Sequence, residues 1–376
     1  MVNRRQFISA LGSVSLIGTA AATGSGLSAE DVPKEVPSGP IYLNQNENPL
    51  GMSPHAKKAA NAALAYGHRY PDAMVRSLAA KIAHTEGLSN DSVIIGAGST
   101  GLLIAQMFAM SGPNTTVIAP APTFSRVERQ CAVTGATYVP LPVNDRFEVD
   151  LEGLERLSAK TTGPVIVYIV TPNNPTGVLV PTNPLFNWIK RAPANVFFLI
   201  DEAYHDFVDD PAYQSAVSLV KEGYKNVFVA RTFSKLHGMA GMRVGYGFGH
   251  ADVTGKISAY YAPWNLALPS IAAAMASLDD TDFIARGKKS NSNGKAILTE
   301  TLDALGLAHI PSQTNFVLHQ ITGDHQTYKD RMEEAGFLVG RYMNTGPGWN
   351  RVSIGTPEEM QAFCRTLKNF RDKDWI

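Results

Sequence analysis

Residues 231–243 read RTFSKLHGMAGMR, and the rest of the chain is organised around this stretch. The apolar residues 226–230 before it predict a buried strand that ends close to Ser234 and Lys235, and Arg243 follows in the same stretch. Burial disfavours a charged amine, so its pKa falls and the free amine can attack a carbonyl carbon. The adjacent hydroxyl and guanidinium suit a phosphate group. Taken alone, such a Ser-Lys pair is more often a solvent-facing loop, because lysine is rarely buried.

Length and composition limit the classes of protein to consider. A chain of 376 residues is longer than a domain with a single hydrophobic core usually is, which predicts two domains. Basic and acidic residues number 33 each, so the charge balance does not suggest a nucleic-acid partner. The two cysteines, Cys131 and Cys364, exclude a disulfide scaffold and give no metal-ligand cluster.

The first 29 residues differ in composition from the rest of the chain. The pair Arg4-Arg5 precedes a weakly apolar run rich in Gly, Ala and Ser at residues 9–19, and small residues follow at 20–22 and 27–29. This order resembles a twin-arginine export signal and predicts a periplasmic or otherwise exported protein. The run is too short and too interrupted for a transmembrane helix. The alternative is a disordered tail on a cytoplasmic protein, and in either case we exclude residues 1–29 from the fold.

The alternation of short apolar runs with helical patterns over residues 66–270 predicts a large α/β domain. Its mainly parallel sheet is expected to contain seven strands, at residues 92–95, 115–119, 137–141, 165–170, 196–200, 227–230 and 244–248. Helices are expected between them at 101–110, 124–133, 184–190 and 212–222. Residues 271–376 predict a smaller α+β domain, which residues 30–65 join as an N-terminal arm. Ligand sites gather at the carboxyl ends of the strands in such sheets.

A glycine-rich loop, GAGSTG at residues 96–101, follows the first of these strands and opens a helix. It matches the dinucleotide-binding fingerprint, which also expects an acidic residue about 20 positions later. The next strand instead ends in Ala119-Pro120, so a nicotinamide cofactor is disfavoured. The free N–H groups of Gly98, Ser99 and Thr100 at a helix N-terminus still suit a phosphate, with a plain capped turn as the alternative.

Three other strand ends carry side chains that suit a cofactor. Phe124 either packs in the core or lies flat on a planar ring. Asn174, within TPNNPTG at residues 171–177, either shapes a turn or donates to a ring oxygen. Asp201 ends an apolar strand and needs a cationic partner if it is buried, unless it is an exposed helix cap. A protonated pyridine nitrogen is such a partner, and it would keep the ring an electron sink.

These strand ends together predict one pocket. Phosphate donors, a stacking ring, an amide donor, an acid and a lysine describe a site for a planar, phosphorylated aldehyde with a basic ring nitrogen. Pyridoxal 5'-phosphate is that molecule, and we expect it as the cofactor.

The order of the motifs resembles a known family. GAGST, PTF, TPNNPTG, DEAY, SK and GMRVGY follow one another as in the class I/II aminotransferases, whose structure is the pyridoxal-phosphate-dependent transferase fold type I. The motifs NENP at 46–49, YP at 70–71, NF at 315–316 and RVSIG at 351–355 make the chain most similar to the histidinol-phosphate aminotransferase family. The resemblance extends from about residue 40 to the C-terminus.

The resemblance implies roles for the residues that match its motifs. Lys235 would bond to the cofactor aldehyde and move the substrate's proton, Asp201 would pair with the ring nitrogen, and Asn174 and Tyr204 would contact the ring hydroxyl. Phe124 takes a stacking position where tyrosine is usual. The resemblance assigns the cofactor phosphate to Gly98, Ser99, Thr100, Ser234 and Arg243, together with Tyr70 of a second subunit. A homodimer with shared active sites is therefore implied.

The resemblance is less definite about the substrates, an amino donor and a 2-oxo acid. Arg351 would bind the substrate carboxylate, with Asn48 and Asn315 beside it. Arg341 is the candidate for binding a distal phosphate of the substrate, although fewer residues separate it from Arg351 than in the family pattern. Thr100-Gly101 also replaces an acidic pair that is common after the phosphate loop. The sequence thus leaves open whether the substrate carries a phosphate.

Two alternatives to transamination remain at this stage. A decarboxylase similar to the threonine-phosphate decarboxylases of the same fold would break the bond to the carboxylate, a choice that motifs do not reveal. A non-catalytic binding module of this fold is disfavoured, because every catalytic position is filled.

Overall fold

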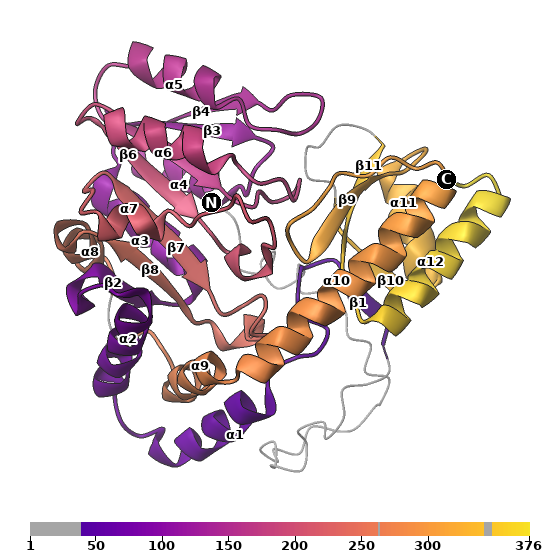
Figure 1. The fold of residues 1–376 in the computed structure, drawn as a ribbon, viewed down its shortest axis with the longest axis horizontal. Helices are drawn as coiled ribbons and strands as arrows, with labels where there is room; N and C mark the ends of the chain where they lie inside the picture. Colours follow the sequence, from indigo (N-terminus) through magenta and orange to yellow (C-terminus); the bar gives the residue numbers. More distant parts are fainter. Residues whose placement is uncertain (1–38, 262–263, 342–347) are drawn as a thin grey trace, which may run out of the picture. The chain divides into compact units, whose positions relative to one another are not determined.

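The computed structural model describes residues 39–261, 264–341 and 348–376 (Figure 1). The predicted export signal lies outside the described residues. Residues 40–376 form one compact unit. No helix in the described ranges combines the length and apolar character needed to cross a membrane.

A seven-stranded sheet has the order β2-β8-β7-β6-β5-β3-β4. Strand β8 pairs antiparallel with β7 and β2, whereas the pairs β7–β6, β6–β5, β5–β3 and β3–β4 are parallel. The mainly parallel seven-stranded sheet expected from the sequence is confirmed. Its strands are β2 (Val93–Gly96), β3 (Thr116–Ala121), β4 (Thr137–Pro142), β5 (Val165–Val170), β6 (Val196–Asp201), β7 (Val227–Thr232) and β8 (Gly245–Gly249).

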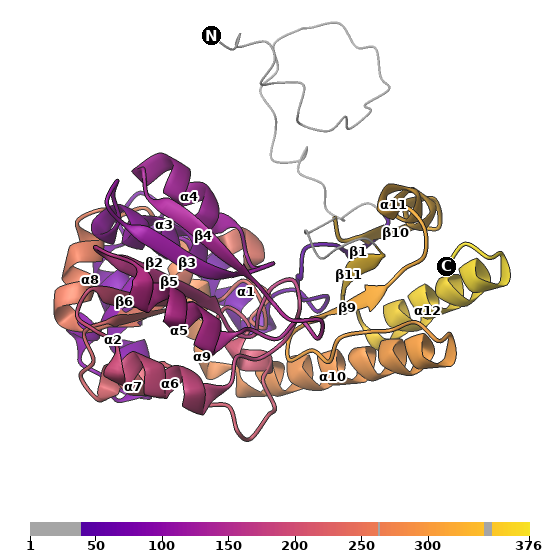
Figure 2. The same cartoon turned by 90° about the horizontal axis from the view of Figure 1, so that it is seen from above.

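Both faces of this sheet are buried, because successive side chains of a strand point to opposite faces. In β5, Val165, Val167 and Ile169 join the core on one face, while Ile166 and Tyr168 join the core on the other. Figure 2 shows helices on both sides of the sheet. The first core includes residues of α2 (Asp72–Glu86), α5 (Leu151–Lys160), α6 (Thr182–Arg191) and α7 (Val217–Lys221), and the second includes residues of α3 (Gly98–Met110), α4 (Arg126–Thr134) and α8 (Ala251–Ser258).

A separate apolar core lies at the C-terminal end of the chain. Strand β1 (Ile41–Leu43) pairs in parallel with β10 (Phe337–Val339), and β9 (Phe316–Gln320) pairs antiparallel with β11 (Trp349–Ser353). These strands share an apolar cluster with α10 (Thr281–Ala304), α11 (His325–Glu334) and α12 (Pro357–Asp372). Thr356 begins α12 with a capping box, in which its side chain and that of Glu359 each accept the other's backbone N–H.

Several elements differ from those expected. The patterns at α5, α8 and α11 were not predicted as helices, although each is amphipathic or flanked by a cap. The helix expected at 212–222 is shortened to α7, because residues 208–216 are irregular backbone with a turn at 211–212. Helix α9 (Leu268–Asp279) packs with α1 (Pro54–Ala63) in the core of the large sheet. This packing favours a domain boundary near the start of α10, and the boundaries drawn from the sequence stay predictions.

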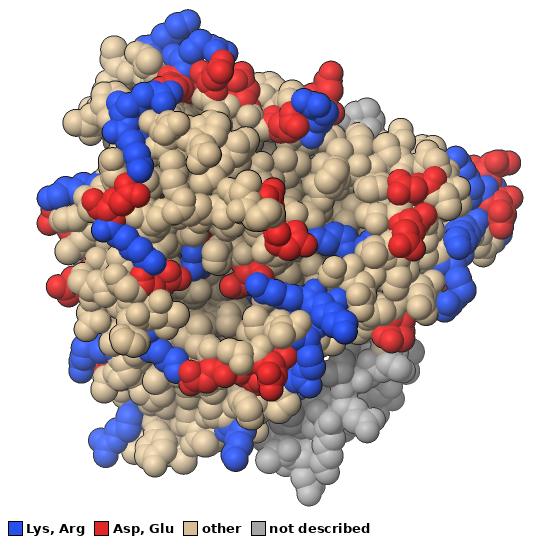
Figure 3. Space-filling view, in the orientation of Figure 1, with Lys and Arg blue, Asp and Glu red and all other residues tan. Residues whose placement is uncertain are grey.

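Short 3₁₀ helices complete the described secondary structure, at Leu64–Tyr66, Asn90–Ser92, His205–Phe207 and Ala240–Met242. On the face drawn in Figure 3, basic and acidic side chains are interspersed over the described residues.

Candidate active site

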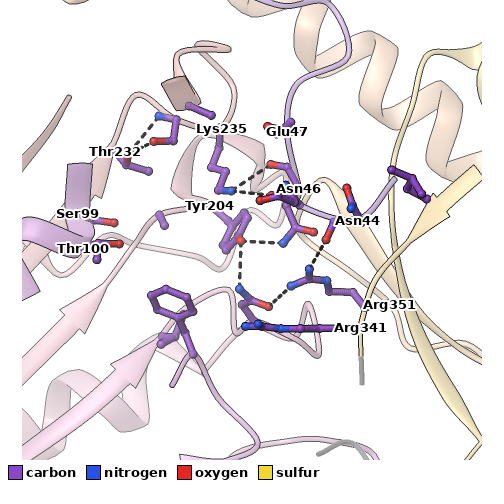
Figure 4. A pocket seen from close by; sticks show the side chains of 18 of the residues that line it. Asn44, Asn46, Glu47, Ser99, Thr100, Tyr204, Thr232, Lys235, Arg341 and Arg351 are labelled. Atoms are coloured by element: carbon purple, nitrogen blue, oxygen red, sulfur yellow. Dashed lines mark hydrogen bonds between the residues drawn. The ribbon is translucent and has the colours of Figure 1, made fainter. Parts of the chain in front are cut away.

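A pocket of about 710 Å³ opens at the carboxyl ends of β5, β6 and β7. Its wall also includes the start of α3, the polar segment 44–47 that follows β1, and residues of β10 and β11. Figure 4 shows Lys235, Tyr204 and Arg351 converging on this space from different elements. Most residues that the sequence assigned to the cofactor line the pocket: Ser99, Thr100, Phe124, Asn174, Asp201, Tyr204, Ser234, Lys235 and Arg243.

Lys235 lies just beyond the end of β7 and projects into the pocket. Its Nζ donates to the backbone oxygens of Gln45, at 3.2 Å, and Asn46, at 3.1 Å. Burial, reinforced by the nearby Arg351 guanidinium, lowers the pKa of Lys235 from 10.5 to about 8. About a tenth of this amine is therefore unprotonated and nucleophilic at pH 7, far more than for an ordinary lysine.

Asp201 is the last residue of β6 and is almost fully buried. One carboxylate oxygen accepts from the Ala203 backbone N–H at 3.1 Å, and the other accepts from the Tyr168 hydroxyl at 3.4 Å. Burial raises the pKa of Asp201 from 3.8 to about 7. In the described ranges, no basic side chain forms an ion pair with this carboxylate. An acid in this position suits a ligand that carries a positive charge.

The turn from β2 into α3 forms a cradle of backbone N–H groups. Gly98 has a φ of +71°, and a Cβ there would collide with Nη2 of Arg243. Arg243 also donates from Nη1 to the Ser234 hydroxyl, at 3.2 Å. The first residues of α3 receive no side-chain cap from Ala97, so their N–H groups are available to an anion.

A chain of hydrogen bonds joins the lysine side of the pocket to Arg351. The Tyr204 hydroxyl accepts from the side-chain amides of Asn46, at 2.9 Å, and Asn174, at 3.3 Å. Arg351 donates from Nη1 to Oδ1 of Asn174, at 2.7 Å, and from Nη2 to the backbone oxygen of Asn44, at 2.8 Å. Desolvation lowers the pKa of Arg351, and its buried Nε has no hydrogen-bond partner in the described chain. One donor of this guanidinium is thus left unpaired among the described residues.

The other predicted site residues occupy different positions. Arg341 lines the pocket beside Arg351 (Figure 4). Asn48 and Asn315 instead donate hydrogen bonds to backbone oxygens. Asn48 donates to that of Leu236, at 2.6 Å, and Asn315 to that of Asn46, at 3.0 Å. Tyr70 is 82% exposed and lies away from the pocket wall of its own chain.

Some pocket residues were missed in the sequence. Gln45 and Glu47 belong to the polar run after β1, whose position next to a lysine could not be read from its local pattern. Lys329 and Glu333 also line the wall from α11, a helix that was itself not predicted. Their spacing of four residues places them on one helix face, and that periodicity is the signal that was available.

The comparisons with known proteins agree with this geometry. The family described as aminotransferase class I and II matches residues 38–367, and the chain belongs to this family. It is therefore a pyridoxal-phosphate-dependent aminotransferase, as the motifs predicted.

Similar proteins include the histidinol-phosphate aminotransferase 1 of Cupriavidus pinatubonensis, 35% identical over 88% of each chain. The histidinol-phosphate aminotransferase of Symbiobacterium thermophilum is also 35% identical, over 91% of this chain and 94% of that protein.

Among solved structures, a putative histidinol-phosphate aminotransferase from Erwinia carotovora atroseptica is 38% identical with a TM-score of 0.88, covering 90% of this chain and 97% of that one. The Sinorhizobium meliloti histidinol-phosphate aminotransferase in complex with pyridoxal 5'-phosphate is 26% identical with a TM-score of 0.82, covering 89% and 91%.

The side chains of the pocket fit pyridoxal 5'-phosphate. The buried Asp201 carboxylate is without a cation among the described residues, which suits the ring nitrogen. Lys235 offers an amine of lowered pKa to the aldehyde. The uncapped start of α3, with Ser234 and Arg243, matches the phosphate. No group of three His, Cys, Asp or Glu side chains in the described ranges is arranged to hold a metal ion.

Proposed function

We propose that this aminotransferase exchanges an amino group between an amino-alcohol phosphate of the histidinol-phosphate type and a 2-oxo acid such as 2-oxoglutarate. The observation that carries the proposal is the pair of guanidiniums, Arg351 and Arg341, on the wall of the pocket that contains Lys235. They are near enough that the charge of Arg341 contributes to lowering the pKa of Arg351. Two guanidiniums suit a doubly charged phosphate, because each presents a fork of N–H donors. The names of the relatives support the same substrate.

The roles of the cofactor-side residues follow from their contacts. Asp201 would pair with the ring nitrogen, Asn174 and Tyr204 would hydrogen-bond the ring hydroxyl, and Phe124 would lie against the ring. The phosphate would be held by Gly98, Ser99, Thr100, Ser234 and Arg243. When bound, the cofactor supplies an electron sink for the negative charge that forms at the substrate α-carbon.

Lys235 is the acid–base group of this proposal. Its unprotonated amine accepts the proton from the substrate α-carbon, and a pKa near 8 suits both uptake and release near neutral pH. The backbone oxygens of Gln45 and Asn46 already accept hydrogen bonds from Nζ. They would therefore stabilise the ammonium that carries the proton until it is returned.

One experiment separates this reaction from decarboxylation on the same fold. The purified protein, loaded with pyridoxal phosphate, is incubated with histidinol phosphate and 2-oxoglutarate, and glutamate and carbon dioxide are both measured. Transamination yields glutamate in proportion to substrate consumed. Histidinol phosphate has no carboxylate to lose, so a parallel incubation replaces it with threonine phosphate. Release of carbon dioxide there, without glutamate, would identify a decarboxylase.

The phosphate assignment is tested by comparing histidinol phosphate with histidinol. Arg341→Ala is expected to raise KM for the phosphorylated substrate about 10-fold or more, and to leave KM for the unphosphorylated one nearly unchanged. Equal KM values for Arg341→Ala and the unaltered protein would remove histidinol phosphate from consideration.

The exposed Tyr70 supports a homodimer in which each subunit completes the other's phosphate site. Mixing subunits tests this arrangement. Lys235→Ala and Tyr70→Phe are each poorly active alone. A hybrid dimer of the two contains one site with both native residues, so activity recovers towards half of the native value. Recovery is absent if Tyr70 acts within its own subunit.

Export through a twin-arginine signal at residues 1–29 completes the proposal, and it is supported by the Arg4-Arg5 pair and the run that follows. A reporter fused behind residues 1–40 is expected in the periplasm, and Arg4→Lys together with Arg5→Lys is expected to retain it in the cytoplasm. Equal export of both reporters would contradict the assignment.

A further inference from the structure

The turn that opens α3 has an unusual partner on its outer side. In a capping box, an acidic or amide side chain at the third helical residue accepts the backbone N–H of the N-cap residue. Here the N-cap is Ala97 and the third helical residue is Thr100. The Ala97 N–H donates instead to the hydroxyl of Tyr261, which comes from beyond the end of α8.

The helix leaves room for this tyrosine ring. Gly101 lies in the first turn of α3, and a Cβ at that position would be 3.4 Å from Cε2 of Tyr261 and 3.6 Å from its hydroxyl oxygen. A methyl group would only touch the ring, whereas a longer side chain directed the same way would collide with it. The Thr100-Gly101 pair, which departs from the acidic pair of the family resemblance, therefore matches the presence of Tyr261.

The backbone oxygen of Ala97 also has a side-chain partner. Arg243 donates from Nη2 to the backbone oxygen of Ala97, at 3.3 Å, and from Nη1 to the Ser234 hydroxyl. Tyr261 and Arg243 thus fix the N–H and the C=O of Ala97, directly before Gly98 and Ser99. Burial raises the pKa of Tyr261, so its oxygen is neutral at physiological pH. A glutamate in this position would bring a negative charge close to the phosphate. The neutral hydroxyl of Tyr261 accepts the hydrogen bond without that charge.

We propose that Tyr261 is a positioning residue for the cofactor phosphate, holding the turn at residues 97–99 from outside the pocket. Its hydroxyl accepts the N–H of the N-cap residue, as the acid of a capping box does, but carries no charge. The inference rests on the proposed assignment of Gly98, Ser99 and Arg243 to the phosphate.

The test uses cofactor-free protein and the variant Tyr261→Phe, which removes only the hydroxyl. The matched control is Tyr260→Phe, since Tyr260 is 58% exposed and its ring stacks on Phe108. Dissociation constants are measured for pyridoxal 5'-phosphate and for pyridoxal, which lacks the phosphate. The ³¹P resonance of the bound cofactor and the thermal midpoint of the cofactor-free protein are recorded for each variant.

Tyr261→Phe is expected to weaken pyridoxal 5'-phosphate binding about 10-fold, the value of one hydrogen bond, and to leave pyridoxal binding unchanged. Its ³¹P resonance should shift, while Tyr260→Phe matches the unaltered protein in every measurement. Equal losses for both ligands, or a dissociation constant within about twofold of the native one, overturn the inference.

A second pair of variants approaches the same contact from the helix. Gly101→Ala should keep native affinity, and Gly101→Leu should reproduce the loss seen in Tyr261→Phe, because only leucine displaces the ring. Native affinity in Gly101→Leu also overturns the inference. If the unaltered protein itself bound pyridoxal and its phosphate equally, the proposed phosphate site would be wrong, an outcome distinct from failure of the Tyr261 contact alone.

Discussion

Arg351 donates a 2.7 Å hydrogen bond to the side-chain oxygen of Asn174, which connects the end of β5 with β11 across the pocket. The same asparagine donates to the Tyr204 hydroxyl. We therefore expect a substrate anion that binds Arg351 to alter the hydrogen bond between the guanidinium and Asn174. Substrate binding would then affect the amide beside the cofactor ring.

The first prediction concerns the guanidinium fork of Arg351. Arg351→Lys keeps the charge but cannot contact Asn174 and Asn44 together, so KM for the amino donor should rise by about 10–100-fold. Steady-state kinetics with each substrate measure the change. Arg371→Lys is the control, because Arg371 forms a similar fork on the backbone oxygens of Ile376 and Leu305, outside the pocket. A native KM in Arg351→Lys would show that this arginine does not bind substrate.

The second prediction identifies the covalent attachment site. Borohydride reduction of the cofactor-loaded protein should leave a pyridoxyl group on the peptide containing Lys235, and Lys235→Ala should lose both this label and transamination. Lys295 is the internal control, since burial also lowers its pKa but its Nζ donates to the Ser312 oxygen outside the pocket. Mass spectrometry of the peptides decides, and a label on Lys295 would contradict the assignment.

The third prediction follows from the raised pKa of Asp201. Its folded pKa of about 7 exceeds the ordinary 3.8, so between these values the folded protein binds a proton that the unfolded chain does not. The stability of the cofactor-free protein therefore falls as pH rises from about 4 to 7. Asp201→Asn removes this penalty and should be more stable than the native protein at pH 8, by on the order of 2–4 kcal/mol, with little difference below about pH 4.

Urea unfolding of both cofactor-free proteins at several pH values measures the effect of this substitution. A stability difference that stays constant from pH 5 to pH 8 would mean that Asp201 does not titrate in this range. Adding pyridoxal 5'-phosphate should stabilise the native protein more than Asp201→Asn, because only the carboxylate can pair with the ring nitrogen.

The fourth prediction concerns Arg231, a buried residue of β7. Arg231, whose side chain is 6% exposed, donates from Nε to Glu202 at 3.0 Å and from Nη1 to Glu86 at 2.8 Å. Arg231→Met leaves the almost fully buried Glu202 without its partner, and should destabilise the protein by on the order of 3–5 kcal/mol. Urea unfolding is the measurement. The control is Lys225→Met, which removes an exposed ion pair with Asp252. The urea midpoint of this variant should equal that of the native protein.

The fold was largely predictable because its strands are buried on both faces. Continuous apolar runs such as β5 and β6 have few alternatives, and their carboxyl ends located Asn174 and Asp201 correctly beside the pocket. Helix α11 was missed because its polar composition and weak amphipathic pattern resemble a loop. Its residues Lys329 and Glu333 were lost with it.

Contacts made through the backbone could not be predicted. Nothing in the identity of Gln45 indicates that its carbonyl accepts from Lys235, more than 180 positions away. The Tyr261 contact with Ala97 is hidden for the same reason, since a helix cap is normally sought within the first turn.

The backbone oxygens of residues 44–46 have a consequence for how the sequence can vary. They receive hydrogen bonds from three side chains of other elements: Arg351, Lys235 and Asn315. A carbonyl group remains whichever side chain its residue carries, so positions 44 and 45 should tolerate many substitutions. Asn46 is different, because its φ of +55° favours asparagine or glycine and its amide also donates to Tyr204. In a library that varies all three positions, selection should fall mainly on position 46.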